Sequence, residues 1–351
     1  MQLTYENNTL QAYTVTLKLL RDPFIQMQIE IAIALVLVGF LLLMWSADLL
    51  VDNASELAGN LGISTFLVGV VIVGFGTSAP ELFVSAMASL EGKGNLALGN
   101  ALGSNITNIG MVLGSAALVR ALPVSRSTAT IDLPIVLFTG VLAIVLIMDG
   151  LLSFIDGIIL LGVLLGYLAW SAKAPQGQEL EPSGSEMLNA PSAETRSQSS
   201  KPTSVYAAWT VFSIIVLMAA SKILVSGAIT IAEYFGVGEL IIGLTIVAIG
   251  TSLPELAAAI AAARKGVHDM IIGNIIGSNV FNTLGVLGLT GALRATEIET
   301  SALWRDFPVM FAFTALMFIF ALTKGRFGRL EGGLFLFSYL SYLGYLIFIS
   351  V

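Results

Sequence analysis

An internal repeat with a period of 174 residues is the feature that most constrains the fold of this chain. Residues 66–120 align with residues 240–294 without a gap, and 21 of the 55 aligned pairs are identical. Unrelated segments of this length would share only a few identities. The repeat predicts that both halves of the chain have the same fold, with equivalent positions 174 residues apart.

Long apolar runs determine the class of protein. The chain is 56% hydrophobic and only 11% charged, whereas about a quarter of the residues of a soluble domain are charged. Runs of this length predict helices that cross a membrane. The ten runs lie at about 28–51, 64–90, 95–119, 131–149, 153–171, 205–233, 238–263, 269–293, 304–323 and 330–350.

The polar stretch between the fifth and sixth runs divides the chain. It is rich in Ser, Pro, Glu and Gln, a composition that cannot bury a core and is typical of a flexible linker. The sequence therefore predicts an N-terminal extension at 1–27, a first five-helix repeat at 28–171, a linker at 172–203 and a second five-helix repeat at 204–351.

Five helices in each repeat predict that the two repeats are inverted. Because five is odd, the second copy must cross the membrane in the opposite sense, which is a common build of secondary transporters. We therefore expect an all-α integral membrane protein with ten transmembrane helices. If both termini are outside, ten basic residues lie on the inner side and five on the outer side. The positive-inside rule then favours both termini outside and a cytoplasmic linker. We expect the protein in the inner or plasma membrane.

Two copies of one polar motif interrupt the apolar runs. Gly76-Thr-Ser-Ala-Pro-Glu-Leu82 recurs as Gly250-Thr-Ser-Leu-Pro-Glu-Leu256. The proline removes a backbone donor and opens the helix, and a carboxylate at membrane depth marks a functional site by default. A single glutamate could merely stabilise packing, but two matched copies favour a shared pocket. The matched polar residues are Thr77, Ser78 and Glu81, and Thr251, Ser252 and Glu255.

The third helix of each repeat has a polar stripe. Side chains spaced by four residues lie on one face of a helix, whereas Asn105 and Asn279 point elsewhere. Asn and Ser also join helices by hydrogen bonds, so packing is the alternative to ion binding. The two stripes are Asn100, Ser104 and Asn108, and Asn274, Ser278 and Asn282.

The predicted pocket offers only oxygen ligands, which suit a hard cation. Calcium takes six to eight oxygens with flexible geometry, and two glutamates would neutralise it. Sodium also takes oxygen ligands and could occupy the same pocket. The chain has no cysteine and one histidine, His268 in a loop, so soft metals lack their ligands.

Several other functions find no support. No His-Glu-x-x-His motif and no serine with a plausible base occur, so we expect neither an enzyme nor a cofactor. The sequence lacks the basic stripe that nucleic-acid binding requires. Apart from the lipid bilayer, no obligate partner is evident from the sequence. Asp48 and Lys222 occupy equivalent positions of the repeats. We expect them near helix ends, with their charges reaching water; a role in gating is the alternative.

At these motifs the sequence resembles the cation/Ca2+ exchanger superfamily. The segments 69–113 and 243–287 look like its two α-repeats. The forms GTSAPEL with GNALGSNITN and GTSLPEL with GNIIGSNVFN are similar to the sodium/calcium exchanger branch and its bacterial members. Proton-coupled calcium exchangers usually have a different sequence around the glutamate.

The resemblance implies an inverted five-plus-five fold with calcium between Glu81 and Glu255. It also implies calcium ligation by the backbone carbonyls of Thr77 and Thr251, and alternating access by sliding of the first and sixth helices. Asn282 replaces an aspartate found in several exchangers and in the potassium-dependent group. The remaining implied ligands are the sodium-site hydroxyls of Ser78, Ser252, Ser104 and Ser278, with Asn108 at the centre and Asn282 opposite.

The sequence therefore predicts an antiporter that exchanges Ca2+ for Na+. A proton/calcium antiporter is the nearest alternative, because buried glutamates can also take up protons. A potassium-dependent sodium/calcium exchanger is a second alternative. The replacement of the aspartate by Asn282 removes a negative charge from the pocket and argues against potassium dependence. A cation channel is an alternative of a different class, and the inverted repeat argues against it.

Overall fold

The computed structural model describes residues 23–173, 202–235, 248–300 and 302–350, and most of these residues are helical. Predictions for most of the N-terminal extension, nearly all of the linker and the start of the seventh apolar run therefore fall outside the described residues. Helix α2 begins at Pro23, α9 ends at Lys173 and α10 begins at Thr203.

The first half of the chain folds into a series of helices, several of which contain a wider π-helical turn (η). Its elements are α2 (Pro23–Leu61), α3 (Thr65–Val68), η1 (Gly69–Val73), α4 (Gly74–Thr77), α5 (Ala79–Leu90), α6 (Gly94–Thr107), η2 (Asn108–Leu113), α7 (Gly114–Val119), β1 (Leu122–Pro123), η3 (Thr128–Asp132), α8 (Leu133–Ile147), β2 (Leu151–Leu152) and α9 (Phe154–Lys173).

The described part of the second half follows the same order. Its elements are α10 (Thr203–Tyr234), α12 (Ala248–Thr251), α13 (Leu253–Lys265), α14 (His268–Val280), η6 (Phe281–Val286), α15 (Leu287–Leu293), β3 (Thr296–Glu297), η7 (Ala302–Asp306), α16 (Phe307–Lys324), β4 (Arg326–Phe327) and α17 (Arg329–Ser350).

Eight of the described helices are long and apolar enough to cross a membrane. A ninth candidate consists of two helices, 65–77 and 79–90, which meet at an angle of 43°. The protein is therefore a mostly helical, multi-pass membrane protein. The seventh predicted helix begins at 238, and residues 236–247 lie outside the described part of the chain, so the count of ten stays a prediction.

Two helical segments form the centre of the molecule. In the most apolar stretch of 268–293 every residue is buried, and in that of 94–119 the buried share is 78%. In the other six spans it is between 17% and 33%. The central segments also contain the predicted polar stripes. The exposed faces of the outer helices are apolar, as lipid-facing surfaces must be.

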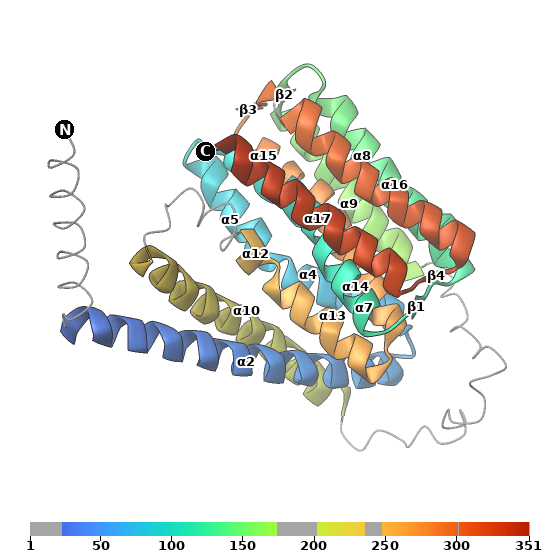
Figure 1. Cartoon of the computed structure of the whole chain (residues 1–351). Helices are drawn as coiled ribbons and strands as arrows, with labels where there is room; N and C mark the ends of the chain where they lie inside the picture. Colours follow the sequence, from blue (N-terminus) through green and yellow to red (C-terminus); the bar gives the residue numbers. More distant parts are fainter. Residues whose placement is uncertain (1–22, 174–201, 236–247, 301, 351) are drawn as a thin grey trace, which may run out of the picture.

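The long helices α2 and α10 lie side by side and form one layer beside the remaining helices (Figure 1). Glycines allow their backbones to approach closely. A Cβ atom added at Gly39 would lie 2.7 Å from the amide nitrogen of Leu224, and one at Gly227 would lie 2.6 Å from the carbonyl oxygen of Ala32. This pair packs against α13 along part of α2.

Two short antiparallel strand pairs link the two halves of the chain. Leu122 of β1 pairs with Phe327 of β4, and Leu151 of β2 pairs with Glu297 of β3. Each pair joins an end of α8 to the opposite end of α16, so these two packed helices run antiparallel (Figure 1). Under the 174-residue shift β1 falls on β3, and β2 falls within one residue of β4.

The prediction for Asp48 and Lys222 was wrong. Asp48 lies well inside α2, which continues to Leu61, and Lys222 lies well inside α10, which continues to Tyr234. The apolar runs underestimate both helices, because polar residues follow the apolar part of α2 without breaking its backbone. Asp48 therefore projects from the flank of a continuing helix.

Candidate cation site

Each Thr-Ser-x-Pro-Glu motif produces the expected break in its helix. Helix α4 ends at Thr77 and α5 begins at Ala79, with Ser78 between them at φ −85° and ψ 2°. Ser252 has nearly the same conformation, φ −94° and ψ 7°, between α12 and α13. In both copies the proline lies in the first turn of the following helix, where its missing donor costs nothing.

The break places both carboxylates at helix starts inside the protein. Glu81 lies in the first turn of α5 and Glu255 in the first turn of α13, and each is only 1% exposed. Unpaired amides at a helix N-terminus stabilise negative charge. Ser78, three residues before Glu81, donates its hydroxyl to Glu255 Oε1, so the two glutamates belong to the same buried region. A buried pair of like charges needs a cation or protons to be stable.

Hydrogen bonds join the motif of the first half to the second half of the chain. Ser78 Oγ donates to Glu255 Oε1 at 3.3 Å, and Thr77 Oγ1 donates to Asn274 Oδ1 at 3.4 Å. Ser278 Oγ lies 3.5 Å from both the Gly74 carbonyl oxygen and Asn274 Oδ1. The structure thus brings Thr77, Ser78, Glu255 and Ser278 into one buried cluster.

The other predicted residues surround this cluster on the packed elements. Turn η2, which begins at Asn108, packs against α13, which contains Glu255. Turn η6, which contains Asn282, packs against α5, which contains Glu81. Ser104, Asn108, Asn282 and Ser252 are buried, whereas Thr251 is half-buried. No hydrogen bond between described residues joins Ser104, Asn108 or Asn282 directly to a glutamate.

Several buried polar atoms at this centre have no hydrogen-bond partner among the described residues. They are both carboxylate oxygens of Glu81, Oε2 of Glu255, Oγ of Ser252, and both amide atoms of Asn108 and of Asn282. An unpaired buried polar group costs about 1–3 kcal/mol, and more when it is charged. A cation bound between the glutamates would satisfy the oxygens among them.

The donor set selects the class of cation. Among the described residues no three side chains from His, Cys, Asp and Glu form a group that could hold a metal ion. Two carboxylates with hydroxyl, amide and backbone oxygens instead match the ligands of calcium. Neutral oxygens of the same kind also suit sodium.

Glycines in α14 hold the two halves together at the site. A Cβ added at Gly277 would lie 2.3 Å from the Val70 carbonyl oxygen, and one at Gly273 would lie 2.3 Å from that of Phe66. Only glycine fits such an approach. The first part of the broken helix, 65–77, therefore lies backbone to backbone with α14, which positions Gly74 beside Ser278.

Two asparagines play a larger part than expected. Asn274, which the sequence placed in a stripe but not among the ligands, accepts hydrogen bonds from both Thr77 and Ser278. Its equivalent, Asn100, donates to Ser85 Oγ at 2.9 Å and to the Glu81 carbonyl oxygen at 3.2 Å. Their positions four residues before the serines were the available signal.

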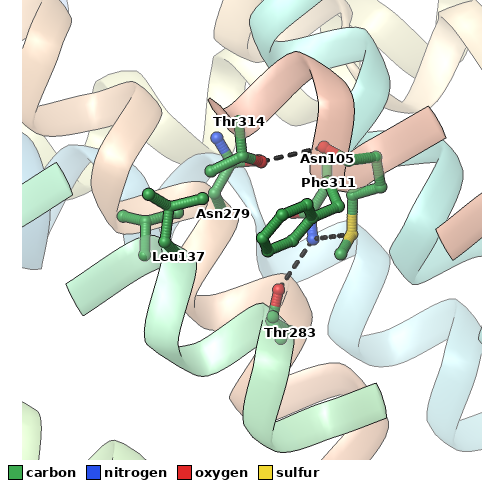
Figure 2. Close-up of a pocket in the computed structure, with 9 residues that line it drawn as sticks. Asn105, Leu137, Asn279, Thr283, Phe311 and Thr314 are labelled. Atoms are coloured by element: carbon green, nitrogen blue, oxygen red, sulfur yellow. Dashed lines mark hydrogen bonds between the residues drawn. The ribbon is translucent and has the colours of Figure 1, made fainter. Parts of the chain in front are cut away.

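A second polar cluster lies on the other side of the central helices, in the small pocket shown in Figure 2. Asn105 Nδ2 donates to Thr283 Oγ1 at 2.7 Å and contacts Met310 Sδ at 3.3 Å. Asn279 lines the same pocket. The cavity volume is about 10 Å³, room for about one water molecule. With no charged side chain in its lining, this pocket does not resemble a cation site.

Comparison with known proteins fits this geometry. The sequence matches the family model of the sodium/calcium exchanger protein over residues 31–173 and 205–348. This chain belongs to the sodium/calcium exchanger family. The exchanger is 30% identical to the sodium/calcium exchanger MaX1 of Methanosarcina acetivorans over 351 residues, 92% of this chain and 100% of that protein.

Two further relatives agree with the assignment. The exchanger is 42% identical to the inner membrane protein YrbG of Escherichia coli (strain K12) over 281 residues, 80% of this chain and 85% of that protein. Its fold matches a crystal form of the sodium-calcium exchanger NCX_Mj soaked with Na+ and Sr2+, with a TM-score of 0.77 and 30% identity. That match covers 90% of this chain and 98% of NCX_Mj. The resemblance inferred from the motifs is confirmed, and the family is one of transporters.

Proposed function

We propose that this exchanger expels Ca2+ against inward Na+ by alternating access, with the ion held between Glu81 and Glu255. The supporting observation is the buried cluster in which a hydroxyl of one half binds the carboxylate of the other, Ser78 Oγ to Glu255 Oε1 at 3.3 Å. A relative named as a sodium/calcium exchanger that covers 92% of the chain supports the choice of ions.

Calcium would be held by the two carboxylates and the backbone carbonyls of Thr77 and Thr251. Sodium would use the hydroxyls of Ser78, Ser104, Ser252 and Ser278. The amide oxygens of Asn108 and Asn282 would complete the cage, since each lies buried beside the helix that bears a glutamate. Ca2+ and Na+ would then compete for shared oxygens, and this competition couples their transport.

The architecture that supports this mechanism is a pair of inverted repeats with ten transmembrane helices. Antiparallel α8 and α16, and strand pairs that exchange positions under the 174-residue shift, support the inversion. We place the repeats at 28–171 and 204–351, an extension at 1–27 and a cytoplasmic linker at 172–203. The relative named as an inner membrane protein supports an inner membrane location.

Ion flux in proteoliposomes tests the exchange. Calcium uptake is measured with sodium, potassium and pH gradients imposed one at a time, beside liposomes with the Glu255→Gln variant. We expect uptake to follow an outward sodium gradient. Uptake driven by a pH gradient in sodium-free buffer would instead establish a proton antiporter, and uptake without any counter-ion would indicate a channel.

Thiol labelling in cells tests the orientation. The native chain has no cysteine, so one cysteine introduced into the linker reports on that segment alone. A membrane-impermeant maleimide should label it only after the membrane is opened. Labelling in intact cells would place the linker outside and reverse the proposed topology.

A further inference from the structure

The C-terminal end of α13 is joined to α2 by ion pairs. Lys265 Nζ lies 2.8 Å from Asp52 Oδ1 and 3.8 Å from Asp48 Oδ1, and it also donates to the Asp48 carbonyl oxygen at 2.7 Å. Asp48 and Asp52 are four residues apart and therefore lie on one face of α2. Two like charges at this spacing destabilise a helix unless a cation lies between them. Lys265 supplies that cation.

The repeat gives this contact an equivalent with the charges exchanged. The 174-residue shift pairs Asp48 with Lys222 and Lys265 with Glu91. An acid on α2 and a base at the end of α13 thus correspond to a base on α10 and an acid directly after α5. Charge complementarity is kept although both signs are reversed. Reversing one of the two charges in a repeat, without the other, would have placed two like charges opposite each other.

The equivalent contact is not formed in this structure. Glu91 instead pairs with Lys93 at 2.7 Å in an exposed position, and such surface pairs contribute little stability. Lys222 is exposed and has no ion pair with any residue that the structure describes. Helix α2 packs along α13, whereas within the described chain α10 makes no comparable contact with α5.

The two turns themselves are built alike at opposite ends of the molecule. Gly92 and Gly266 both have positive φ, 80° and 75°. The guanidinium of Arg294 lies over Gly92 and that of Arg120 over Gly266, so each turn is braced by the other repeat. Asn95 donates to the Glu297 carbonyl oxygen, which fixes the Gly92 turn near β3. The contact with α2 or α10 is a clear difference between them: the end of α13 is paired with α2, whereas no such pairing joins the end of α5 to α10 among the described residues.

From this asymmetry we infer that Lys265 with Asp48 and Asp52, and Glu91 with Lys222, are two alternative latches that position the α2–α10 pair in opposite states of the transport cycle. In a transporter of two inverted repeats one bundle moves as a rigid body against the other, and we take the second state to be the one in which each repeat adopts the conformation of the other. The Asp48–Lys265 contact then opens and the Lys222–Glu91 contact forms at the other end. The inference rests on the alternating access proposed above.

Cross-linking tests the two latches directly in the full-length protein, which has no native cysteine. One variant combines Asp48→Cys with Lys265→Cys, and the other combines Glu91→Cys with Lys222→Cys. A short bis-methanethiosulfonate reagent is applied to proteoliposomes during exchange. A third variant, Asp149→Cys with Lys222→Cys, is the control, because Asp149 is exposed beside β2 at the same end as Glu91.

Both latch pairs should cross-link, each should stop transport, and reduction should restore it, while the control pair stays uncross-linked. If the Glu91/Lys222 pair never cross-links during exchange although the Asp48/Lys265 pair does, the second latch does not exist. The cross-linking reaction does not depend on which ions the protein transports. Cross-linking at both pairs without Ca2+ transport would therefore support the latches and reject the proposed function.

Charge exchange separates a latch from mere packing. Lys265→Glu should shift the rate at which an impermeant thiol reagent labels a cysteine at the Lys222 position by about two- to fivefold, the range of a partly exposed ion pair. Adding Asp48→Lys and Asp52→Lys should restore the original rate. If Lys222→Cys is labelled at the same rate in the variant with all three charge changes as in the variant with Lys265→Glu alone, the attraction between the charges does not position α2.

Discussion

Replacement of Gly277 by alanine tests whether the site depends on the close contact between α14 and the broken helix. A Cβ at this position would lie 2.3 Å from the Val70 carbonyl oxygen, about 1 Å short of an ordinary contact. The clash is with backbone, so no side chain can rotate away and the helices must separate. Overpacking of this kind costs about 1–3 kcal/mol, more than the ~1 kcal/mol that alanine gains over glycine in a helix.

The same displacement should weaken cation binding. Ser278 follows Gly277 directly, and its hydroxyl lies 3.5 Å from the Gly74 carbonyl oxygen. A further separation of about 1 Å exceeds the ~0.5 Å tolerance of a binding constellation. We expect at least about a tenfold rise in the Ca2+ concentration for half-maximal uptake, which corresponds to about 1.4 kcal/mol.

Thermal unfolding in detergent and calcium uptake in proteoliposomes measure both effects. Gly162→Ala in α9 is the matched control, because a Cβ there meets no described atom within 4 Å. The control should unfold at the native temperature or slightly above it and should transport normally. If Gly277→Ala behaves like Gly162→Ala in both assays, the backbone contact does not position the site.

Four further substitutions test the glutamates, Asn282 and the small pocket. Glu81→Gln and Glu255→Gln should each abolish calcium uptake while the protein remains inserted and monodisperse, because one carboxylate cannot neutralise Ca2+; normal uptake by either would rule out a shared pocket. Asn282→Asp adds a charge at the centre and should change the competition of Na+ and K+ with Ca2+ uptake, whereas an unchanged competition curve would remove Asn282 from the site. Asn105→Leu breaks the 2.7 Å hydrogen bond to Thr283 and should lower thermal stability by about 1–3 kcal/mol with the calcium dependence unchanged; a shift in that dependence would link the small pocket to the cation site.

The sequence predicted the helix breaks well, since proline acts locally and the repeat supplied an independent second copy. Ser78 and Ser252 lie at the breaks with nearly the same backbone angles. The sequence also predicted the membrane class of the protein and the polar stripe in the third helix of each repeat. These features could be predicted because each depends on the composition and residue spacing of a single segment, without contacts to other segments.

Other features depend on contacts between distant segments. The π-helical turns that begin at or next to Asn108 and Asn282 have no sequence pattern, so spacing by four residues does not give the direction of these side chains. The stripe pattern did not distinguish Asn274, which is central only because Thr77 of the other half reaches it. The contact of Asp48 with Lys265 could not be predicted either, since the two residues lie 217 positions apart.

The intimate contact of Gly273 and Gly277 with the other half of the chain has an evolutionary consequence. Each half contributes one carboxylate, and the hydroxyl that donates to Glu255 comes from the first half, so a single repeat would contain only half of the proposed site. An ancestor with one repeat would have bound its ion only as a dimer of two copies inserted in opposite directions. If the repeats are inverted as proposed, gene duplication and fusion would have made that arrangement permanent and left the two copies free to diverge in charge, as they have at Asp48 and Lys222.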